Sequence, residues 1–548
     1  MREWWRDAVI YQIYPRSFQD DNGDGIGDLP GITRRLDHVA SLGVDAIWLS
    51  PFFTSPDLDM GYDVSDYIGV NPLFGTIEDF DALVAKAHAL GMKVIIDQVL
   101  SHTSDQHPWF TESRESRDNP KADWYVWADP QRDGTPPNNW VSVFGGSAWQ
   151  FDTRRKQYYF HNFLTEQPDL NFHNPEVVDA LLGTMKFWLD RGVDGFRLDT
   201  VNYYVHDRRL RNNPPSDWVH FPNNPYEAQF QIYSKTQPEN IGVLQKMRAL
   251  TDQYDDRMMV GEVGEMGDRQ IEIMAEYTAG NDRLHMAYSF AMLSHDHRAA
   301  HFRNCIAGFL RDAPDGWPCW SFSNHDVQRH VTRWTPKGGS ADAVAKQAIA
   351  MLCSFPGTLN IYQGEELGQT ETDIEWEELQ DTANARFWPE YKGRDGCRTP
   401  MTWEAEAPNA GFSPAKPWLP VKAPQAARAA DRQNSDPGSV LNAYRTTLAF
   451  RKSRDPLRFG ETTFLDLPEP ILGLVRTLGG DSVSALFNLS DSPQRVTLRT
   501  ELRPIGPMVA MVDGAVPSNQ GIIDAPVIEL PAWGYVYLDG AAEIAEAI

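Results

Sequence analysis

Apolar positions in the first 200 residues recur in one order: a helical pattern ends at a glycine, and a short apolar run follows at once. The order repeats at residues 42–48 (LGVDAIW), 90–97 (LGMKVIID) and 191–197 (RGVDGFR). Such a glycine suits a left-handed helix C-cap, and each run suits a strand covered on both faces. The pattern predicts helices that alternate with parallel strands.

Helix starts support this reading. Thr76 with Asp79 resembles a capping box, and Asn174 before Pro175 places a cap ahead of a proline at the first helical position. Further apolar runs predict five more strands, at residues 9–14, 257–262, 285–290, 319–323 and 358–362.

Eight strands in βα succession favour an α/β fold, a closed (β/α)8 TIM barrel whose active site lies at the carboxyl ends of its strands. A doubly wound sheet is the competing layout. It would normally carry a glycine-rich phosphate turn after its first strand, whereas the glycines that follow Tyr14 are interleaved with aspartates.

Three regions depart from the alternation. Residues 102–171, rich in Trp, Tyr, Pro, Asn and Gly, predict a domain inserted after the third strand, and residues 370–435 predict a long loop insertion after the eighth. Short runs of β-formers over residues 457–548 predict a C-terminal antiparallel β-sandwich. Residues 1–101 and 172–456 then form the two parts of the barrel.

Composition narrows the ligand. The 548 residues include 50 Lys and Arg against 76 Asp and Glu, a formal charge of −26. This balance argues against nucleic acid and against anionic membrane surfaces. With 41% hydrophobic residues and no apolar stretch of about 20 residues, the chain is expected to be globular, without a spanning helix. A small neutral or cationic ligand remains.

The four cysteines, at positions 305, 319, 353 and 397, are widely scattered. This spacing predicts core thiols rather than a zinc site or a disulfide framework. Residues 1–7 show no secretory signal, so we expect a cytoplasmic protein, as a monomer or homodimer.

Candidate chemistry is concentrated at predicted strand ends. In residues 195–199 (GFRLD), Arg197 and Asp199 share one strand face, while Phe196 and Leu198 face the helices. Arg197 is expected to lower the pKa of Asp199 and so keep a carboxylate nucleophile ionised. A structural ion pair inside the barrel is an equally good interpretation of this pentapeptide alone.

Other strand ends add the remaining groups. Asp97 and His102 follow the third predicted strand, Glu262 ends the fifth and Asp326 follows the seventh. Carboxyl ends of barrel strands converge on one rim. Carboxylates supported by His and Arg, with no metal cluster among them, fit glycoside hydrolysis.

These segments resemble the signature regions of glycoside hydrolase family 13, the α-amylase family. Residues 167–171 (QPDLN) resemble the additional region of its oligo-1,6-glucosidase and α-glucosidase branch, and the likeness is nearest to bacterial α-glucosidases. Residues 8–18 (AVIYQIYPRSF) and 393–401 (GRDGCRTPM) extend it over about the first 450 residues.

The resemblance implies roles for individual residues. Asp199 is the expected nucleophile, Glu262 the general acid and base, and Asp326 the third carboxylate, which grips sugar hydroxyls. Those implied to hold the glucosyl ring are Asp63, His102, Arg197, His325 and Arg398. A retaining mechanism requires the Asp199 and Glu262 carboxyls to lie about 5 to 5.5 Å apart, and Glu262 to keep its proton at neutral pH.

Thr200 bears on the substrate. In relatives of this branch, Val after the nucleophile tends to accompany α-1,6 linkages, and Ala or Thr α-1,4 linkages. The resemblance therefore implies an exo-acting α-glucosidase for short, maltose-like substrates, with no organic cofactor. Transglucosylation is expected as well, because a covalent intermediate can pass to any well-placed acceptor. Residues 202–240, rich in Pro and Asn, are predicted to wall the site against polymers.

Three alternatives stay open. A sucrose-active hydrolase or isomerase would use the same intermediate, and an oligo-1,6-glucosidase is disfavoured by Thr200. A non-catalytic binding homologue would lack the carboxylates that this chain retains.

A final motif, in residues 20–31, predicts a structural divalent cation, Ca²⁺ or Mg²⁺. Its oxygen donors at alternate positions are Asp20, Asn22, Asp24, the Ile26 carbonyl and Asp28. The loop is not an EF-hand, since position twelve is Gly31 rather than Glu. Among the aromatic residues, the predicted sugar-stacking candidates are Trp109, Trp140, Trp149 and Trp388.

Overall fold

The barrel is built from eight parallel strands. The computed structural model describes residues 3–267, 269–513 and 526–547. The strands form one sheet in the order β11-β10-β9-β5-β2-β1-β13-β12. A parallel bridge between Ala287 and Pro318 links the two outer strands and nearly closes the sheet into a barrel. The predicted (β/α)8 barrel is confirmed, and the doubly wound alternative is not what forms.

Strand bounds agree with the sequence pattern to within one or two residues. The barrel strands are β1 (Val9–Ile13), β2 (Ala46–Leu49), β5 (Lys93–Gln98), β9 (Gly195–Leu198), β10 (Met258–Val263), β11 (Met286–Ser289), β12 (Cys319–Ser321) and β13 (Thr358–Tyr362). The predicted C-cap glycines, Gly43, Gly91 and Gly192, have φ values of 80°, 80° and 97°, in the left-handed region that glycine tolerates.

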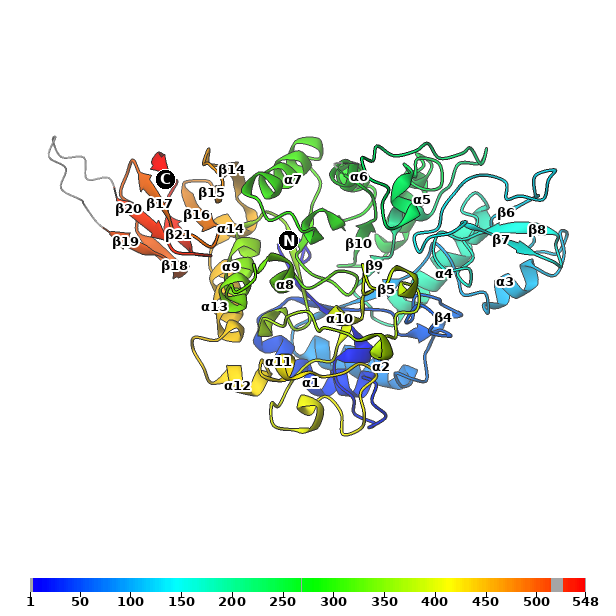
Figure 1. Ribbon diagram of the computed structural model, residues 1–548, viewed down its shortest axis with the longest axis horizontal. Helices are drawn as coiled ribbons and strands as arrows, with labels where there is room; N and C mark the ends of the chain where they lie inside the picture. Colours follow the sequence, from blue (N-terminus) through cyan, green and yellow to red (C-terminus); the bar gives the residue numbers. More distant parts are fainter. Residues whose placement is uncertain (1–2, 268, 514–525, 548) are drawn as a thin grey trace.

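Helices surround this barrel (Figure 1). The longer ones are α1 (Leu29–Ser41), α2 (Ile77–Ala89), α4 (Pro175–Asp190), α5 (Asn240–Thr251), α6 (Arg269–Thr278), α7 (Ala299–Asp312), α9 (Ala341–Ser354) and α13 (Val440–Lys452). Shorter ones are α8 (His330–Trp334), α10 (Asp395–Arg398), α11 (Ala423–Ala426), α12 (Ala430–Asn434) and α14 (Asp455–Phe459). Helix α2 begins with the predicted Thr76 and Asp79 capping box, and Asn174 caps α4. None of the helices described here is long and apolar enough to cross a membrane.

Alternating strand residues separate two cores. Phe196 and Leu198 join the large cluster between the strands and the helices, as predicted. Trp48 and Val260 belong to a second cluster, which fills the barrel interior. All four cysteines are buried, which agrees with core thiols. Charged side chains on the interior face of a strand must therefore be paired or used.

The inserted segment after β5 folds into α3 (Pro108–Ser113) and a three-stranded sheet, β6 (Trp127–Ala128), β8 (Gln157–Phe160) and β7 (Trp149–Asp152). A two-stranded sheet, β3 (Phe53–Thr54) with β4 (Asp66–Val70), follows β2. In Figure 1 the inserted segment lies at one end of the long axis and the C-terminal strands at the other, with the barrel between them.

The C-terminal region contains two antiparallel sheets, ordered β14-β15-β16-β21-β18 and β19-β20-β17-β22. Their strands are β14 (Glu461–Phe464), β15 (Ile471–Leu478), β16 (Asp481–Asn488), β17 (Gln494–Leu498), β18 (Pro504–Val509), β19 (Met511–Asp513), β20 (Val527–Leu530), β21 (Tyr535–Asp539) and β22 (Ile544–Ala547). Leu486 and Val536 of the first sheet share a core with Val496 and Ile528 of the second, as in the predicted sandwich. Residues 514–525 and 548 of the predicted domain lie outside the described residues.

Candidate active site

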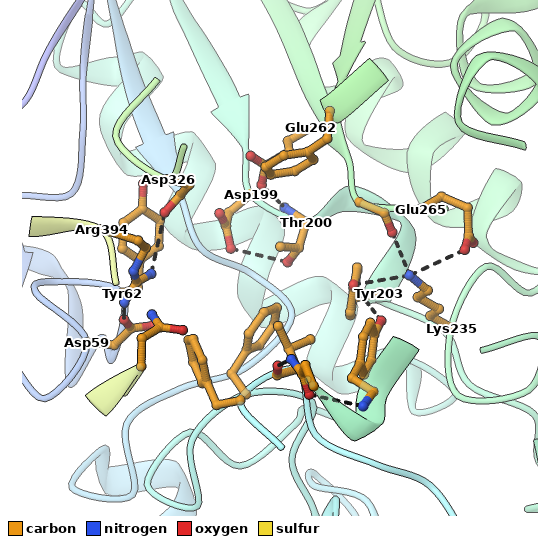
Figure 2. Close-up of a pocket in the computed structure, with 18 of the residues that line it drawn as sticks. Asp59, Tyr62, Asp199, Thr200, Tyr203, Lys235, Glu262, Glu265, Asp326 and Arg394 are labelled. Atoms are coloured by element: carbon orange, nitrogen blue, oxygen red, sulfur yellow. Dashed lines mark hydrogen bonds and ion pairs between the residues drawn. The ribbon is translucent and has the colours of Figure 1, made fainter. Parts of the chain in front are cut away.

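A cavity of about 470 Å³ lies at the carboxyl ends of the barrel strands (Figure 2). Asp199 directly follows β9, Glu262 is the next-to-last residue of β10, and Asp326 follows β12. All three residues line the cavity. Its size falls within the range of small-molecule sites. The predicted convergence of these three strand ends on one pocket is therefore what the structure shows.

Arg197 organises the carboxyls. Asp97 on β5 pairs in register with Arg197 on β9, so the two side chains point together into the barrel. Nη1 of Arg197 contacts Asp97 Oδ1 at 2.8 Å and Asp199 Oδ1 at 2.5 Å, and Nη2 contacts Glu262 Oε1 at 2.5 Å. One buried guanidinium thus faces three carboxyl groups.

This imbalance sets the proton affinity of the cluster. Burial raises the pKa of Asp199 to about 7, and the opposing effect of Arg197 is offset by Asp97. Burial likewise raises the pKa of Glu262 to about 7 and that of Asp97 to about 6. The prediction that Arg197 would give Asp199 a low pKa is wrong, because a single cation cannot neutralise three buried acids. The raised pKa of Glu262 agrees with the proton donor that the sequence analysis expects at this position.

Thr200 lies between the two central carboxyls. Its N–H donates to Glu262 Oε2 at 3.2 Å, and its hydroxyl donates to Asp199 Oδ2 at 3.2 Å. Its φ of 39° is uncommon for a β-branched residue. Tyr288, opposite Glu262 in the β10–β11 register, donates its hydroxyl to Glu262 Oε1 at 2.9 Å. These contacts hold both carboxyls close to one guanidinium, while their separation of about 5 to 5.5 Å stays a prediction.

Asp326 has a different electrostatic environment. Arg398 Nη2 donates to its Oδ1 at 3.0 Å, and Arg394 Nη1 donates to the same oxygen at 3.4 Å. Burial alone would raise the pKa of Asp326, but the neighbouring His325 together with the Arg398 and Arg394 guanidiniums outweighs it and holds the pKa well below its usual range. Asp326 is therefore ionised at neutral pH, whereas the carboxyls around Arg197 gain and lose protons near neutrality.

Two buried histidines support the site as neutral groups. Burial lowers the pKa of His102 to about 4 and holds that of His325 well below its usual range. His325 Nδ1 is 2.8 Å from Gln12 Nε2, and its Nε2 is 2.5 Å from the Tyr62 hydroxyl. His102 lies 3.0 Å from the Tyr62 carbonyl through Nε2 and 2.8 Å from Ser101 Oγ through Nδ1. Each ring is thereby fixed in orientation.

The structure does not bring Asp63 into the cavity. Its carboxylate instead closes a turn, accepting hydrogen bonds from Ser55 Oγ at 2.8 Å, from the Leu58 N–H at 2.9 Å and from the Asp59 N–H at 3.1 Å. Asp59 lines the cavity in its place and accepts a hydrogen bond from Arg394 Nη2 at 2.7 Å. Asp59 is therefore the carboxylate that lines the cavity, while the expected contact of Asp63 with a sugar stays a prediction.

Arg394 is the second group that the sequence interpretation missed. It lines the cavity and bonds Asp381 as well as Asp59, whereas Arg398 lies behind Asp326 and donates through Nε to the His325 carbonyl at 2.7 Å. Of the residues implied to contact the substrate, His102 and Thr200 line the cavity, while those set behind its lining are Arg197, His325 and Arg398. A possible signal was the 393–401 motif, which contains both arginines.

Comparison with known proteins identifies the family. Residues 12–460 match the family described as alpha amylase, catalytic domain. The chain is 54% identical over 540 residues to a probable alpha-glucosidase of Rhizobium meliloti (strain 1021), across 97% of this chain and 96% of the relative. It is 38% identical over 534 residues to the oligo-1,6-glucosidase of Heyndrickxia coagulans, across 90% and 93%. The chain belongs to the α-amylase family, glycoside hydrolase family 13.

Two solved structures resemble the chain over almost its whole length. The alpha-glucosyl transfer enzyme XgtA gives a TM-score of 0.92 at 50% identity, over 99% of this chain and 100% of that one. The trehalulose synthase MutB from Pseudomonas mesoacidophila MX-45 gives 0.87 at 33% identity, over 98% and 100%. The predicted resemblance is confirmed, and so is the prediction that the chain is a glycoside hydrolase.

The aromatic lining of this family member was not predicted correctly. None of the four tryptophans proposed as stacking residues lines the cavity. Trp140 and Trp149 stack within the core of the inserted segment, and Trp388 packs against Trp376. The aromatic residues that do line the cavity are Tyr62, Phe144, Phe163, Tyr203, Tyr226, Phe290 and Tyr391.

In the acidic loop of residues 20–28, the carboxylates accept hydrogen bonds mainly from nearby backbone N–H groups. Asp20 accepts from the Gly23 and Gly25 N–H groups and from Ser413 Oγ, and Asp28 caps α1 by accepting from the Gly31 N–H. Across residues 3–267, 269–513 and 526–547, no three His, Cys, Asp or Glu side chains are grouped as a metal site. The predicted cation ligands stay a prediction.

Proposed function

We propose that the protein is a retaining, exo-acting α-glucosidase, which removes the terminal glucosyl unit of short α-glucosides and prefers α-1,4 linkages. One observation carries this proposal: Asp199 and Glu262 meet adjacent nitrogens of the Arg197 guanidinium in the cavity that Asp326 also lines. Two carboxyls held side by side, with a third beside them, suit double displacement at an anomeric carbon.

The contacts support a division of labour between carboxyl oxygens. Asp199 Oδ1 is occupied by Arg197, whereas Oδ2 accepts only the longer bond from Thr200, so Oδ2 is the attacking atom. Glu262 Oε1 accepts from Tyr288 and contacts Arg197, whereas Oε2 accepts only the 3.2 Å bond from the Thr200 N–H, so the proton is assigned to Oε2.

Bond making and breaking then balance in two steps. Asp199 Oδ2 forms a bond to the anomeric carbon as the glycosidic bond breaks, and the Glu262 proton passes to the leaving oxygen. Glu262 next takes a proton from water, which attacks the same carbon and releases Asp199. Two inversions retain the configuration. Asp326, kept anionic by Arg398 and Arg394, accepts hydrogen bonds from sugar hydroxyls and stabilises the developing positive charge.

The rim of the cavity supports exo action on short substrates. Asn224, from the predicted wall at residues 202–240, donates to the Val143 carbonyl at 2.8 Å. Arg386, from the long loop after β13, donates to the Gly145 carbonyl at 2.9 Å. The inserted segment is thus bonded on both flanks, which favours a closed pocket over an open cleft. A pocket admits a chain end and excludes the middle of a polymer.

The preference for α-1,4 linkages is proposed from Thr200, whose hydroxyl lies between Asp199 Oδ2 and Ser101 Oγ, each at 3.2 Å. A valine would place a methyl group where this hydroxyl lies, and this methyl, which alanine lacks, would change which linkage fits beside Asp199. Transglucosylation is proposed because the likeness to an alpha-glucosyl transfer enzyme extends over 99% of the chain. A sucrose-active isomerase is the second candidate, favoured by the likeness to trehalulose synthase.

We also propose that the loop of residues 20–28 binds a structural divalent cation. Its side-chain and carbonyl donors are all oxygen, the chemistry that Ca²⁺ and Mg²⁺ prefer. Asn22 Oδ1 and Asp24 Oδ1 each accept one backbone N–H, which leaves a lone pair on each oxygen. These two oxygens could therefore bind a cation while they keep their hydrogen bonds to the loop backbone.

The proposal is tested by assaying maltose, isomaltose, sucrose, trehalose, maltotriose and starch, with product anomers followed by NMR. We expect maltose to be cleaved fastest, α-glucose to appear before mutarotation and starch to be a poor substrate. Initial release of β-glucose would contradict retention. Conversion of sucrose to an isomer faster than maltose hydrolysis would favour the second candidate.

A further inference from the structure

A buried lysine lies on the side of the cavity opposite Asp59 and Arg394 (Figure 2). Lys235 is 1% exposed, and its Nζ donates to the Gly264 carbonyl at 2.6 Å and to the Tyr203 hydroxyl at 3.1 Å. Glu265 Oε1 lies 3.6 Å from the same nitrogen. A buried ammonium group is costly unless it is paired, so these contacts hold Lys235 in one place.

Further hydrogen bonds attach a long segment, residues 202–236, to the end of strand β10. Thr236 N–H donates to the Asn202 carbonyl at 2.7 Å, which joins the two ends of residues 202–236. The Asn202 side chain donates to the Gly264 carbonyl and accepts from the Gly264 N–H, both at 3.0 Å. Gly264 comes two residues after Glu262, at the end of β10. The segment base is therefore fixed relative to the catalytic acid.

Backbone conformation points to the same two ends. Thr200 and Thr236 both have positive φ, 39° and 56°. This region is unfavourable for β-branched residues and persists only where surrounding contacts impose it. Thr236 Oγ1 contacts Asn202 Nδ2 at 2.9 Å and Glu265 Oε2 at 3.2 Å. Two unfavourable conformations thus bracket a segment that lines the cavity.

Lys235 also holds an aromatic pair. Its Nζ lies 4.4 Å from the centroid of the Tyr203 ring and 5.6 Å from that of Tyr226. The two tyrosine hydroxyls are hydrogen-bonded at 2.9 Å, and both rings line the cavity. Because the charged groups around Asp326 occupy the other side, this pair faces the part of a substrate that leaves or accepts the glucosyl unit.

We propose that Lys235 is a positioning residue for the acceptor: it fixes the Tyr203 and Tyr226 pair relative to Glu262, and so sets where a leaving sugar or an incoming acceptor sits. This inference rests on the proposed function, in which Glu262 protonates the leaving oxygen. Lys235 does not touch the reacting atoms. Its effect reaches them through the Gly264 carbonyl and the Tyr203 hydroxyl.

Two variants disturb the pair by different routes. Lys235→Met removes the ammonium group, and Gly264→Ala keeps it but adds a methyl 3.1 Å from Tyr203 Cε2. Gly264 has an ordinary φ, so this substitution strains no backbone. If Lys235→Met fails to fold, Gly264→Ala still tests the proposal. Lys246→Met, an exposed lysine on α5, is the matched control.

The readout compares two donors that give the same glucosyl-enzyme: maltose and 2,4-dinitrophenyl α-glucoside. The dinitrophenolate leaves without a proton and needs no sugar subsite, whereas the second glucose of maltose must be aligned with Glu262. We expect both variants to lower kcat/KM for maltose by about 10- to 100-fold and for the aryl glucoside by less than about threefold. Transfer to maltose should decrease relative to hydrolysis, and Lys246→Met should match wild type.

Equal losses on both donors would show a merely structural role and overturn the inference, as would unchanged maltose kinetics in both variants. A wild-type protein inactive on both donors would overturn the proposed function itself, and the inference with it. The wild-type assay therefore separates the two failures.

Discussion

The two sides of the cavity are held in place by different means (Figure 2). On the side formed by Asp59, Asp326 and Arg394, charged groups bond one another. On the side formed by Tyr203, Tyr226 and Lys235, aromatic rings stand on a long segment that is bonded at its base. We call these the glucose side and the acceptor side.

The difference separates chemistry from selectivity. Groups on the glucose side have many partners, so a single change there alters charge, geometry and pKa together. The acceptor side depends on a few hydrogen bonds between segments, and changes there should alter which substrate is used rather than whether catalysis occurs. The predictions that follow test this contrast, from the largest expected effect to the smallest.

Asp199→Asn, a change between the two sides, should have the largest effect on catalysis. The amide cannot form the glucosyl ester, so kcat/KM for maltose should decrease by roughly 10⁴-fold or more. The fold should persist, because an amide of the same shape replaces the carboxyl beside Arg197. Enzyme kinetics and circular dichroism measure the two effects. Residual activity near the wild-type level would contradict the nucleophile assignment.

Glu262→Gln should slow the reactions that need a proton on the leaving group and spare those that do not. With a pKa of about 7 in the folded protein, Glu262 loses its proton as the pH rises through neutrality, so wild-type kcat/KM for maltose should decrease on the alkaline side. Protonation of Asp199, whose pKa is also about 7, should lower it on the acidic side. The variant should lose about 10³-fold on maltose and keep glucosylation by 2,4-dinitrophenyl α-glucoside.

The pH profile of the variant provides the check. Its glucosylation rate with the aryl donor should lack the alkaline decline while keeping the acidic one. An unchanged alkaline decline would assign that limb to another group.

Thr200→Val should change selectivity with little loss of total activity. The maltose to isomaltose ratio of kcat/KM should decrease roughly tenfold, since a methyl group replaces the hydroxyl beside Asp199. Thr200→Ala is the matched control and should keep the α-1,4 preference. If both variants shift the ratio equally, the hydroxyl and not the added methyl decides the linkage.

Opening the rim should have a smaller effect. Arg386→Ala removes the bond to the Gly145 carbonyl, and Asn224→Ala removes the bond to the Val143 carbonyl. Activity on maltopentaose relative to maltose should rise about two- to tenfold, the scale of one lost hydrogen bond. Arg132→Ala, at an exposed site in the inserted segment, should leave the ratio unchanged. A constant ratio in all three would argue against the closed rim as the length filter.

Removal of a cation should act on stability alone. If the loop of residues 20–28 binds a divalent ion, EDTA should lower Tm by about 2 to 5 °C, and added Ca²⁺ or Mg²⁺ should restore it. Asp24→Asn should weaken the response. An identical Tm with and without chelator would remove the cation from the proposal.

The fold was predictable because its signals are local and repeated. Gly43, Gly91 and Gly192 mark the helix ends, and the continuous apolar runs that follow them indicate buried parallel strands. The carboxyls at strand ends were predictable for the same reason: Asp199 and Glu262 must converge once the barrel closes.

The sequence could not show which of two similar side chains forms hydrogen bonds within a loop and which one faces the cavity. Asp59 and Asp63 lie four residues apart, and only the folded turn shows that three donors occupy Asp63 and leave Asp59 for the cavity. The roles of Arg394 and Arg398 can likewise be told apart only from their partners in the fold, since Arg394 bonds Asp59 and Arg398 bonds Asp326. The raised pKa of Asp199 comes first from its burial in the folded protein and then from Asp97, a partner 102 positions away in the chain.

The rim bonds have a consequence for how this scaffold can vary. Asn224 and Arg386 both donate to main-chain carbonyls, those of Val143 and Gly145. Carbonyls are present whatever side chain a position carries, so Val143 and Phe144 can be exchanged without losing the closure, whereas Gly145, with a φ of 78°, is best kept as glycine. Side chains at this edge of the inserted segment can therefore vary while the hydrogen bonds from Asn224 and Arg386 are kept. Phe144, which lines the cavity between these two carbonyls, is the natural first position at which to build a library of altered specificities.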